Sequence, residues 1–534
     1  MGIAYYFSWI IKNHKNIIQK NNLKNVNNLY IDSNSIIYDS INFNNFISTN
    51  QFEEFIIDST IKKLKSIISI FKPNNKIIIA FDGVPPMAKI KQQKNRRYKS
   101  WYTSYILAKQ NKWNTSSITP GTNFMEKLNT EIFRHFNSSS LENKNILLLL
   151  SDTPGEGEHK IFQYIRNNSD IHDNSNTVIY GMDSDLIMLS LKHLYICNNI
   201  YLYRETPEFI KNIDNSLSSD NEYIINIYNL AEQIYLLMTQ KHEKYEQHEQ
   251  HKEYNNDLFY KKINDYILIT YLLGNDFMPH FPAINIRHNG ITILLDLYRS
   301  KIGKNNNLTN NNIVILKTFK SFIENLAINE EQFIINNFII KNKSQNRVFN
   351  SVKDLTEEDK LNLLPQYERN IEKFINPSEE DWRYRYYYSL FNIDYNNEKD
   401  KVNEICNNYL KTLLWTLNYY SGDCNNWKHY YKYEYPPLLV DLYKNIPYFD
   451  SELKLEENKE ILNKYVLLAY VLPKKSLNLL PEKIEKYLIE NHYAYYKENL
   501  EIQYAYCKYF WESHIVFESI ENTNIESYIL NNIS

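Results

Sequence analysis

Acidic side chains close to glycines are the residues of this chain best suited to chemistry. The chain has only ten glycines, and five of them lie next to, or two residues from, an acid in the first 290 residues. Seven carboxylates stand out there: Asp32, Asp82, Glu156, Glu158, Asp183, Asp185 and Asp276. Hard divalent cations prefer oxygen ligands, and two ions about 4 Å apart can stabilise both the attacking and the leaving oxygen of a phosphodiester displacement. Seven acids are therefore enough for two Mg²⁺ ions, with Mn²⁺ as a substitute, and for further carboxylates around them.

Four short apolar runs predict the strands that position these acids. The runs cover residues 29–31, 76–81, 146–150 and 177–182, and each leads to an aspartate. Such runs are typical of strands buried on both faces. Segments of helical periodicity at 52–71, 124–136 and 158–166 separate them, which predicts a doubly wound, mostly parallel α/β sheet. Ligands bind such sheets at the carboxyl ends of the strands. For any single acid, a turn or a helix cap stays the alternative.

Two acidic pairs need a closer description. In residues 154–160 two glycines allow a tight turn into a helix, which predicts that Glu156 and Glu158 lie near its first turn. The alternative for this pair is an acidic helix N-terminus favoured by the helix dipole. Asp183 and Asp185 follow a strand, and the alternation of side chains along a strand would place both on one side of the sheet.

A compact basic segment begins seven residues after Asp82. Its six cations within eleven residues are Lys89, Lys91, Lys94, Arg96, Arg97 and Lys99. Two adjacent guanidinium groups offer bidentate contacts suited to phosphate. We predict a local anion site beside the acidic cluster; the alternative is a solvated helix face.

The composition limits the classes of function. Lys and Arg number 60 against 63 Asp and Glu, so a polyanion site must be a local patch. Four widely spaced cysteines argue against a disulfide framework or a thiolate zinc site and fit a reducing compartment. No apolar run approaches the roughly 20 residues of a membrane helix. Residues 239–257 form a charged, low-complexity insert, where a solvated segment explains His242, His248 and His251 better than a metal site does.

At these motifs the sequence resembles the Xrn family of 5′→3′ exoribonucleases. The matching stretches are residues 1–10, 29–34, 81–97, 118–122, 154–160, 180–188, 204–205 and 274–280. The family's second conserved region matches at 381–387, 427–437, 471–473 and 511–512. The combination is specific, although the Asp-Gly-x-Pro-Pro motif at 82–86 is shared with flap endonucleases.

The resemblance implies a PIN-like 5′-nuclease fold with the seven acids as metal ligands. It also implies a pocket for a 5′-monophosphate formed by Lys89, Gln93, Arg96 and Arg97, with Lys89 stabilising the transition state. A cap or a triphosphate is too bulky for such a pocket, and a 5′-hydroxyl leaves its charges unpaired.

Two aromatic positions depart from the family pattern. Tyr38 stands where a stacking histidine is usual, and the stretch beginning at Trp427 has His429 at its second tryptophan position. Since base stacking tolerates any aromatic face, we predict that Tyr38 with His429 or Trp427 encloses the first base.

The resemblance also implies how the chain is divided. We expect a nuclease domain at 1–300, a helical connection at 301–350, and an aromatic-rich second conserved region at 351–534, mainly helical, that completes the active-site channel. This corresponds to a short form with the two conserved regions only.

The resulting prediction is a processive, metal-dependent 5′→3′ exoribonuclease that converts 5′-monophosphorylated single-stranded RNA to nucleoside 5′-monophosphates. The alternatives are a structure-specific DNA flap nuclease and a non-catalytic RNA-binding scaffold. We expect a monomer without membrane contact, inside the cell and in the cytoplasm rather than the nucleus. The biased, AT-rich composition suits a large DNA virus acting in the host cytoplasm, or a protist.

Overall fold

The computed structural model places most of the chain. It describes residues 2–14, 17–109, 112–137, 145–181, 183–205, 217–219, 221–239, 256–351, 355–449, 453–517 and 524–532. Most of the charged insert, including His242, His248 and His251, lies outside these residues. Among the described helices, none combines the length and the apolar sequence that crossing a membrane requires.

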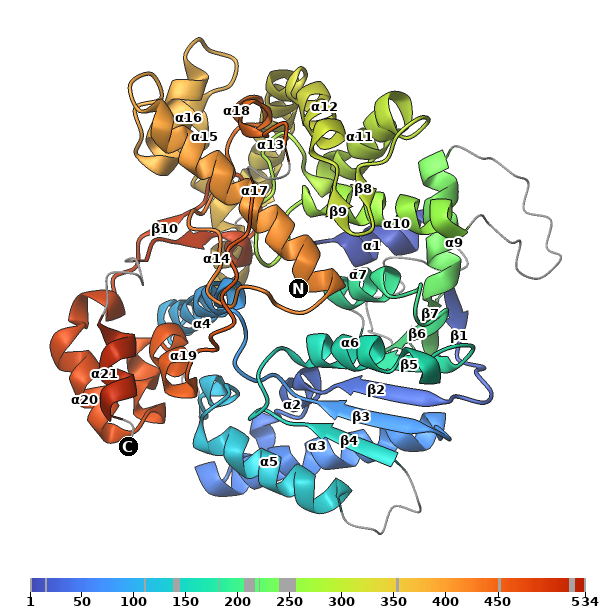
Figure 1. The fold of residues 1–534 in the computed structure, drawn as a ribbon. Coiled ribbons are helices and arrows are strands. Elements are labelled where there is room, and N and C mark those ends of the chain that lie inside the picture. The colour runs from blue at the N-terminus through green and yellow to red at the C-terminus, as the bar shows by residue number, and fades with distance from the viewer. Residues whose placement is uncertain are drawn as a thin grey trace.

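A seven-stranded sheet is the centre of the N-terminal part (Figure 1). Its strands, in the order β1-β7-β6-β5-β2-β3-β4, are β1 (Ile18–Lys20), β7 (Tyr223–Asn226), β6 (Asn199–Tyr203), β5 (Asn176–Tyr180), β2 (Asn28–Asp32), β3 (Lys76–Ala80) and β4 (Asn145–Leu149). The five strands from β6 to β4 are parallel, and β7 and β1 add antiparallel pairs at one edge. The predicted mostly parallel α/β sheet is confirmed.

The strand register brings the carboxyl ends of the central strands together. Asp32 at the end of β2 lies opposite Ala80 at the end of β3, which in turn lies opposite Leu149 of β4. The interior of these strands is apolar, with Ile77, Ile78 and Ile79 almost fully buried. Burial on both faces therefore fixes the strands, and polar residues begin where they end.

Helices cover both faces of the sheet. Helices α3 (Thr49–Phe71) and α5 (Asn123–Phe136) pack on one face, and α6 (Gly157–Asn167) and α7 (Ser184–Lys192) on the other (Figure 1). Alternate strand residues separate into two cores, because Leu29 joins the core with α3 and α5 while Tyr30 joins the core with α6 and α7. This second core continues into the C-terminal part of the chain.

The C-terminal part is mainly helical, as predicted. After α9 (Ile227–Thr239), its helices are α10 (Asn256–Tyr271), α11 (Gly290–Leu297), α12 (Leu316–Ala327), α13 (Glu330–Ser351), α14 (Glu357–Tyr367), α15 (Asn370–Ile375), α16 (Trp382–Phe391), α17 (Lys399–Ser421), α18 (Leu439–Asn445), α19 (Lys464–Val471), α20 (Glu482–Asn491) and α21 (Ile525–Asn532). Two short hairpins, β8–β9 (Thr309–Asn310 and Ile313–Val314) and β10–β11 (Ile502–Gln503 and His514–Ile515), join them. Two N-terminal helices, α2 (Asn34–Asp39) and α4 (Met87–Ile106), line the site described next, and α1 (Tyr6–Asn13) packs into the second core.

Candidate active site

Four carboxylates lie at the carboxyl ends of the parallel strands. Asp32 ends β2, Asp82 follows β3 by two residues, and Glu156 and Asp183 are the N-cap residues of α6 and α7. All four line one cavity. The strand-end position predicted from the apolar runs therefore brings together acids that are up to 151 positions apart in the sequence.

Glu158 and Asp185 lie in the first turn of the same helices and line the same cavity. For Glu158 this is the predicted position. Asp183 and Asp185 both line this cavity, but because α7 begins at Ser184, the helix rather than the alternation of a strand sets their direction. An acid at a helix N-terminus also interacts favourably with the helix dipole.

A glycine lets α6 approach β2. A Cβ atom added at Gly157 would lie 2.7 Å from Asp32 Oδ1, so a larger residue would push the helix away from this carboxylate. The Gly157 backbone N–H donates to Asp82 Oδ1 over 2.8 Å, and Asn34 Nδ2 donates to Asp82 Oδ2 over 2.6 Å. Asp82 is thus held by a backbone N–H group and by a neutral side chain.

Asp276 reaches the site from the other part of the chain through Lys89. Lys89 Nζ lies 2.8 Å from Asp276 Oδ2 and 2.6 Å from Glu156 Oε2. The backbone N–H of Gly2 donates to Asp276 Oδ1. Asp276 lines the adjoining cavity rather than the one with the other six acids. A loop carries Asp276, since α10 ends at Tyr271 and residues 274–276 are not helical.

The cluster holds more negative charge than its surroundings stabilise. Burial raises the pKa of Asp32 well above its ordinary value, and the carboxylates of Asp82 and Asp183 add to the effect. Burial also raises the pKa of Glu158, Glu156 and Asp185. A bound cation would counteract this rise, because a nearby positive charge favours the ionised form of a carboxylate.

The donor set fits a hard divalent cation. Asp32 Oδ1 is buried and has no hydrogen-bond partner among the described residues. One oxygen each of Glu156 and Glu158 and a ring nitrogen of His159 lie within 4.8 Å of one another. A set dominated by carboxylate oxygens matches the preference of Mg²⁺ or Mn²⁺. His159 was not predicted as a candidate ligand, although it stands inside the motif at 154–160.

Two tyrosines of α17 complete the acidic end of the cavity. Tyr419 donates its hydroxyl hydrogen to Glu156 Oε1 over 2.9 Å, and Tyr420 donates to Asp185 Oδ1 over 2.5 Å. Tyr419 also stacks on His159 at 3.7 Å between ring centroids. Sequence analysis missed both tyrosines, because in a chain with 46 tyrosines a Tyr-Tyr pair at a helix end carries no signal.

The basic segment forms α4 and divides between two environments. Lys89, Gln93, Arg96 and Arg97 line the cavity with the acids. Lys91, in contrast, pairs with Glu434 and donates to two backbone carbonyls of the helical part. Because an α-helix has 3.6 residues per turn, the side chains that line the cavity and the side chain of Lys91 point to different sides of α4. A count of charges along the sequence does not reveal this division.

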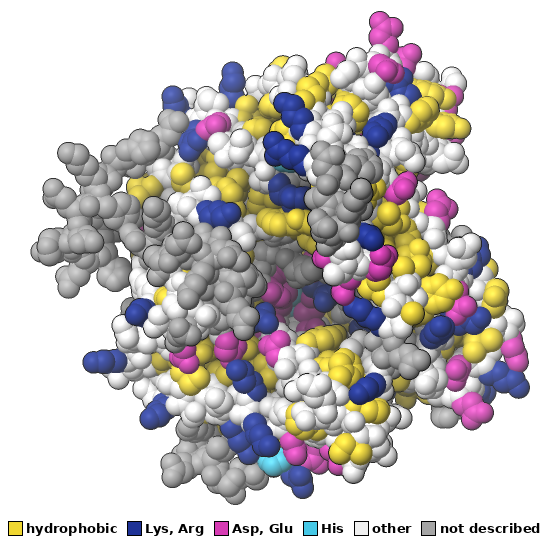
Figure 2. Space-filling view, turned by 180° about the vertical axis from the view of Figure 1, so that it is seen from behind, with side chains coloured by type: hydrophobic (Ala, Val, Ile, Leu, Met, Phe, Trp, Pro, Cys, Tyr) yellow, Lys and Arg dark blue, Asp and Glu magenta, His cyan; other side chains and the backbone are white. Residues whose placement is uncertain are grey.

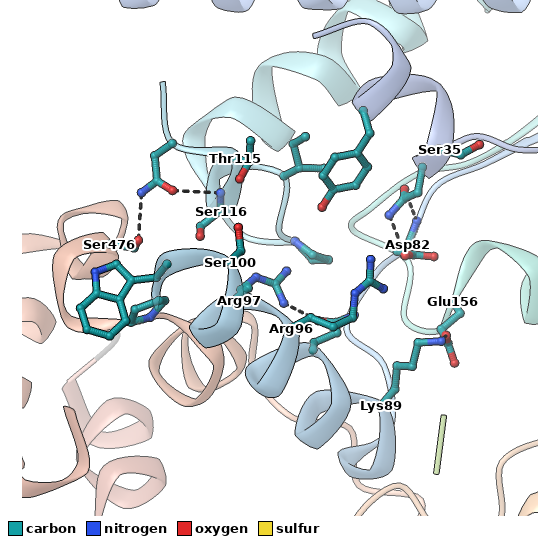
Figure 3. A pocket seen from close by; sticks show the side chains of 18 of the residues that line it. Ser35, Asp82, Lys89, Arg96, Arg97, Ser100, Thr115, Ser116, Glu156 and Ser476 are labelled. Atoms are coloured by element: carbon teal, nitrogen blue, oxygen red, sulfur yellow. Dashed lines mark hydrogen bonds and ion pairs between the residues drawn. The ribbon is translucent and has the colours of Figure 1, made fainter. Parts of the chain in front are cut away.

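The two arginines on α4 are held differently. Arg97 donates to Gln93 Oε1 over 3.2 Å and to Thr119 Oγ1 over 2.7 Å, and burial lowers its pKa to about 10. Arg96 has no hydrogen-bond or ion-pair partner among the described side chains and lies between Arg97 and Lys89 (Figure 3). A rigid and a free guanidinium thus face the same space, next to the acids.

The cavity is large and charged at one end. Its volume is about 740 Å³. From behind, carboxylates lie deep in a hollow with basic side chains around it (Figure 2). Beyond Arg97 lie Ser100, Ser116 and Ser476, as Figure 3 shows. The lining also includes Trp101, Lys109 and Lys475.

The predicted aromatic residues lie apart. Tyr38, on α2, is 45% exposed and lines the cavity. His429 accepts or donates a hydrogen bond with Thr412 Oγ1 over 2.9 Å and lies against the Trp415 ring. Neither Trp427 nor His429 is among the described residues that line the cavity. The enclosure of a base by this pair stays a prediction.

Comparison with known proteins gives matches along most of the chain. Residues 1–206 match the model of the XRN 5′-3′ exonuclease N-terminus, and residues 256–373 and 365–525 match that of the Xrn1 helical domain. The chain is 25% identical to 5′-3′ exoribonuclease 1 of Saccharomyces cerevisiae, over 90% of this chain and 40% of that protein. Identity is 25% to the Homo sapiens protein of that name (90% and 31%) and 22% to the Schizosaccharomyces pombe protein (98% and 48%). The chain thus spans less than half the length of these relatives.

Proposed function

Since the chain belongs to the XRN family of 5′-3′ exonucleases, we propose that it degrades 5′-monophosphorylated single-stranded RNA stepwise from the 5′ end. The products are nucleoside 5′-monophosphates, and the reaction needs divalent metal ions. The observation that carries this proposal is the joint presence of six carboxylates and the Arg96–Arg97 pair in a single cavity. The named relatives are exoribonucleases, which favours RNA over DNA as the substrate.

The acids would hold the metal. Asp32, Asp82, Glu156, Glu158, Asp183 and Asp185 are the proposed ligands for two Mg²⁺ ions, and Asp276 acts next to them through Lys89. Bound Mg²⁺ would activate water and stabilise charge on the scissile phosphate. Tyr419 and Tyr420 orient their carboxylates by hydrogen bonds without adding charge.

The cations of α4 would bind the terminal phosphate. Arg96 is free to turn toward a ligand, whereas Gln93 and Thr119 hold Arg97 in place. A terminal phosphate is a dianion and offers several oxygens to these groups, whereas a 5′-hydroxyl leaves two guanidinium groups unpaired. With the phosphate at Arg96 and Arg97, the first phosphodiester of the strand lies toward the carboxylates, as a 5′→3′ direction requires.

Lys89 links the two functions. Burial works against its charge, but Asp276 and Glu156 hold its pKa well above the ordinary value. It is therefore a permanent cation between the acids and the phosphate pocket. We propose that it contacts the terminal nucleotide and stabilises negative charge that develops on the reacting phosphate.

Matched substrates test the proposal. One RNA sequence is prepared with a 5′-phosphate, a 5′-hydroxyl or a 5′-triphosphate, labelled at the 3′ end and incubated with Mg²⁺. We expect rapid loss of the phosphorylated RNA, release of mononucleotides, and little loss of the other two. A DNA flap serves as a fourth substrate.

Other outcomes would change the proposal. Cleavage of the flap in preference to the RNA would indicate a structure-specific DNA nuclease. Binding without turnover of any substrate, in Mg²⁺ and in Mn²⁺, would indicate a scaffold. A monomeric state, processive action and a cytoplasmic location stay predictions from the sequence.

A further inference from the structure

A second cavity lies away from the acidic one and shares no lining residue with it. Its volume is about 350 Å³. Its walls come from α13 and α14, the 3₁₀ turn Ile286–His288, and the segment 506–508. Nothing in the proposed nuclease reaction uses this cavity.

Cations dominate the lining of this cavity. The six that line it are Arg287, Lys341, Lys343, Arg347, Arg369 and Lys508. Lys341 and Arg369 share a single carboxylate, that of Glu372, at 2.7 and 2.8 Å. Arg287 pairs with Glu512. Two acids thus contact three of the six cations.

The remaining three cations have no acidic partner among the described residues. No ion pair with a described acid involves Lys343, Arg347 or Lys508. This excess of positive charge occurs in a chain of net charge −3, so composition does not explain it. Like charges gathered around one space repel one another, which a bound anion would relieve.

Unsatisfied buried nitrogens point to a ligand as well. Arg287 Nε and His288 Nδ1 are buried and have no hydrogen-bond partner among the described residues. Both residues line the cavity. A buried donor without a partner is costly, and phosphate oxygens would satisfy such donors.

We propose that this cavity binds a small anion with two or more phosphate groups, such as a polyphosphate or a nucleotide polyphosphate. One phosphate would lie deep, near Arg287 and His288, and further phosphates would reach Arg347 and Lys508 at the mouth. A volume of this size is typical of small-molecule sites. A single-stranded nucleic acid would need a longer groove with aromatic stacking platforms, and Tyr506 and His288 are the ring side chains that the described lining provides.

Binding of tripolyphosphate to the full chain tests this proposal. The affinity is measured by isothermal titration calorimetry in EDTA, at constant ionic strength, so that divalent ions do not interfere. We expect the double variant Arg347→Glu/Lys508→Glu to bind roughly tenfold or more weakly, since each change removes a charged contact and adds repulsion. Because Arg347 is exposed and Lys508 is half-buried, the double variant should fold, and a thermal unfolding experiment verifies this.

Two matched variants separate this cavity from other basic sites. Lys65→Glu reverses an exposed charge on α3, and Arg96→Ala removes a cation of the acidic cavity. Lys65→Glu should bind tripolyphosphate like the unchanged protein, and Arg96→Ala should retain the binding that the double variant loses. Loss of binding in Arg96→Ala with retention in the double variant would overturn the proposal. Binding of tripolyphosphate no stronger than that of sulfate would also overturn it. Displacement of tripolyphosphate by a 5′-hydroxyl oligonucleotide would overturn it too, because these cations would then belong to an RNA-binding path. These binding measurements do not depend on nuclease activity, so they remain interpretable even if the proposed function is wrong.

Discussion

The sheet part (residues 2–239) and the helical part (residues 256–532) contribute different things to the candidate active site. The sheet part supplies six of the seven acids and the cations of α4. The helical part supplies one acid, Asp276, and the hydroxyl groups of Tyr419 and Tyr420. The sheet part therefore supplies most of the charge, and the helical part adds one acid and two hydroxyl groups that donate hydrogen bonds to carboxylates of the sheet part.

Burial of an acid has a different result in each part. In the sheet part, clustered acids share one cavity. In the helical part, the buried Glu330 accepts the backbone N–H groups of Leu439 and Val440 and so caps α18. A raised carboxyl pKa thus accompanies a candidate active site in one part and a helix cap in the other. The pKa alone therefore does not identify a functional acid, and the surroundings of the carboxyl group must decide.

Removal of one acid from the sheet part should have the largest effect. We expect Asp183→Ala to lower the rate of RNA degradation by about 1,000-fold or more, because a metal ligand supports several kcal/mol of transition-state stabilisation. RNA binding in Ca²⁺ should persist, since the cations of α4 remain. Single-turnover kinetics and filter binding measure the two quantities. Appreciable Mg²⁺-dependent turnover in this variant would contradict the role assigned to the acidic cluster.

Glu330, a buried acid of the helical part, should affect the stability of the fold instead of the rate of the reaction. Burial, partly offset by the two backbone N–H groups, raises the pKa of Glu330 from 4.5 to about 7. Between these values the folded chain keeps a proton that the unfolded chain has lost, so the free energy of unfolding falls as pH rises. Because one pKa unit corresponds to about 1.4 kcal/mol, we expect a loss of up to about 3 kcal/mol between pH 4.5 and 8 that Glu330→Gln does not show.

Chemical denaturation of both proteins at pH 5 and pH 8 measures this difference. Glu324→Gln, an exposed position on α12, is the matched control and should follow the unchanged protein at both pH values. Equal pH dependence in Glu330→Gln and the unchanged protein would show that Glu330 is ionised throughout. Nuclease activity at one pH should not differ between the variants.

Sequence predicted the sheet part far better than the helical part. Long apolar runs that end at Asp32, Asp82 and Asp183 locate strands, and the register of a parallel sheet then brings the acids together. Tyr419 was unpredictable, because α17 reaches Glu156 across 263 positions through the packing of whole helices. The sequence also did not predict the backbone conformation that directs Asp183 and Asp185, because α7 begins already at Ser184.

Arg96, which no described residue binds, allows a comparison between two cations of α4. We expect Arg96→Ala to raise KM for 5′-phosphorylated RNA roughly 10- to 100-fold, since a hydrogen bond to a charged group is worth about 1.5–3 kcal/mol. Because no described residue bonds to Arg96, its removal should leave the folded protein intact. Lys99→Gln is the control, since Lys99 lies on the same helix but donates to the Trp511 carbonyl outside the acidic cavity. An equal effect of both variants on KM would refute a phosphate pocket at Arg96.

The smallest expected effect tests the contribution of the helical part itself. Tyr420→Phe removes the hydroxyl that donates to Asp185 and leaves the ring in place. Outer partners of metal ligands typically alter metal affinity or activity by about 10- to 100-fold. We expect a change near the lower limit, about tenfold, because Asp185 keeps its position at the N-terminus of α7. The Mg²⁺ concentration that gives half-maximal activity should rise, and a titration of Mg²⁺ measures it.

Tyr271→Phe is a closely matched control for this change. Tyr271 packs against the Tyr420 ring with 5.4 Å between centroids, and its buried hydroxyl has no hydrogen-bond partner among the described residues. Removal of that hydroxyl should leave the Mg²⁺ dependence unchanged and stabilise the fold slightly, because an unsatisfied buried polar group is costly. If both variants shifted the Mg²⁺ dependence equally, the shift would come from the loss of polarity in general. The hydrogen bond from α17 would then have no specific role, and the helical part would serve the acids by packing alone.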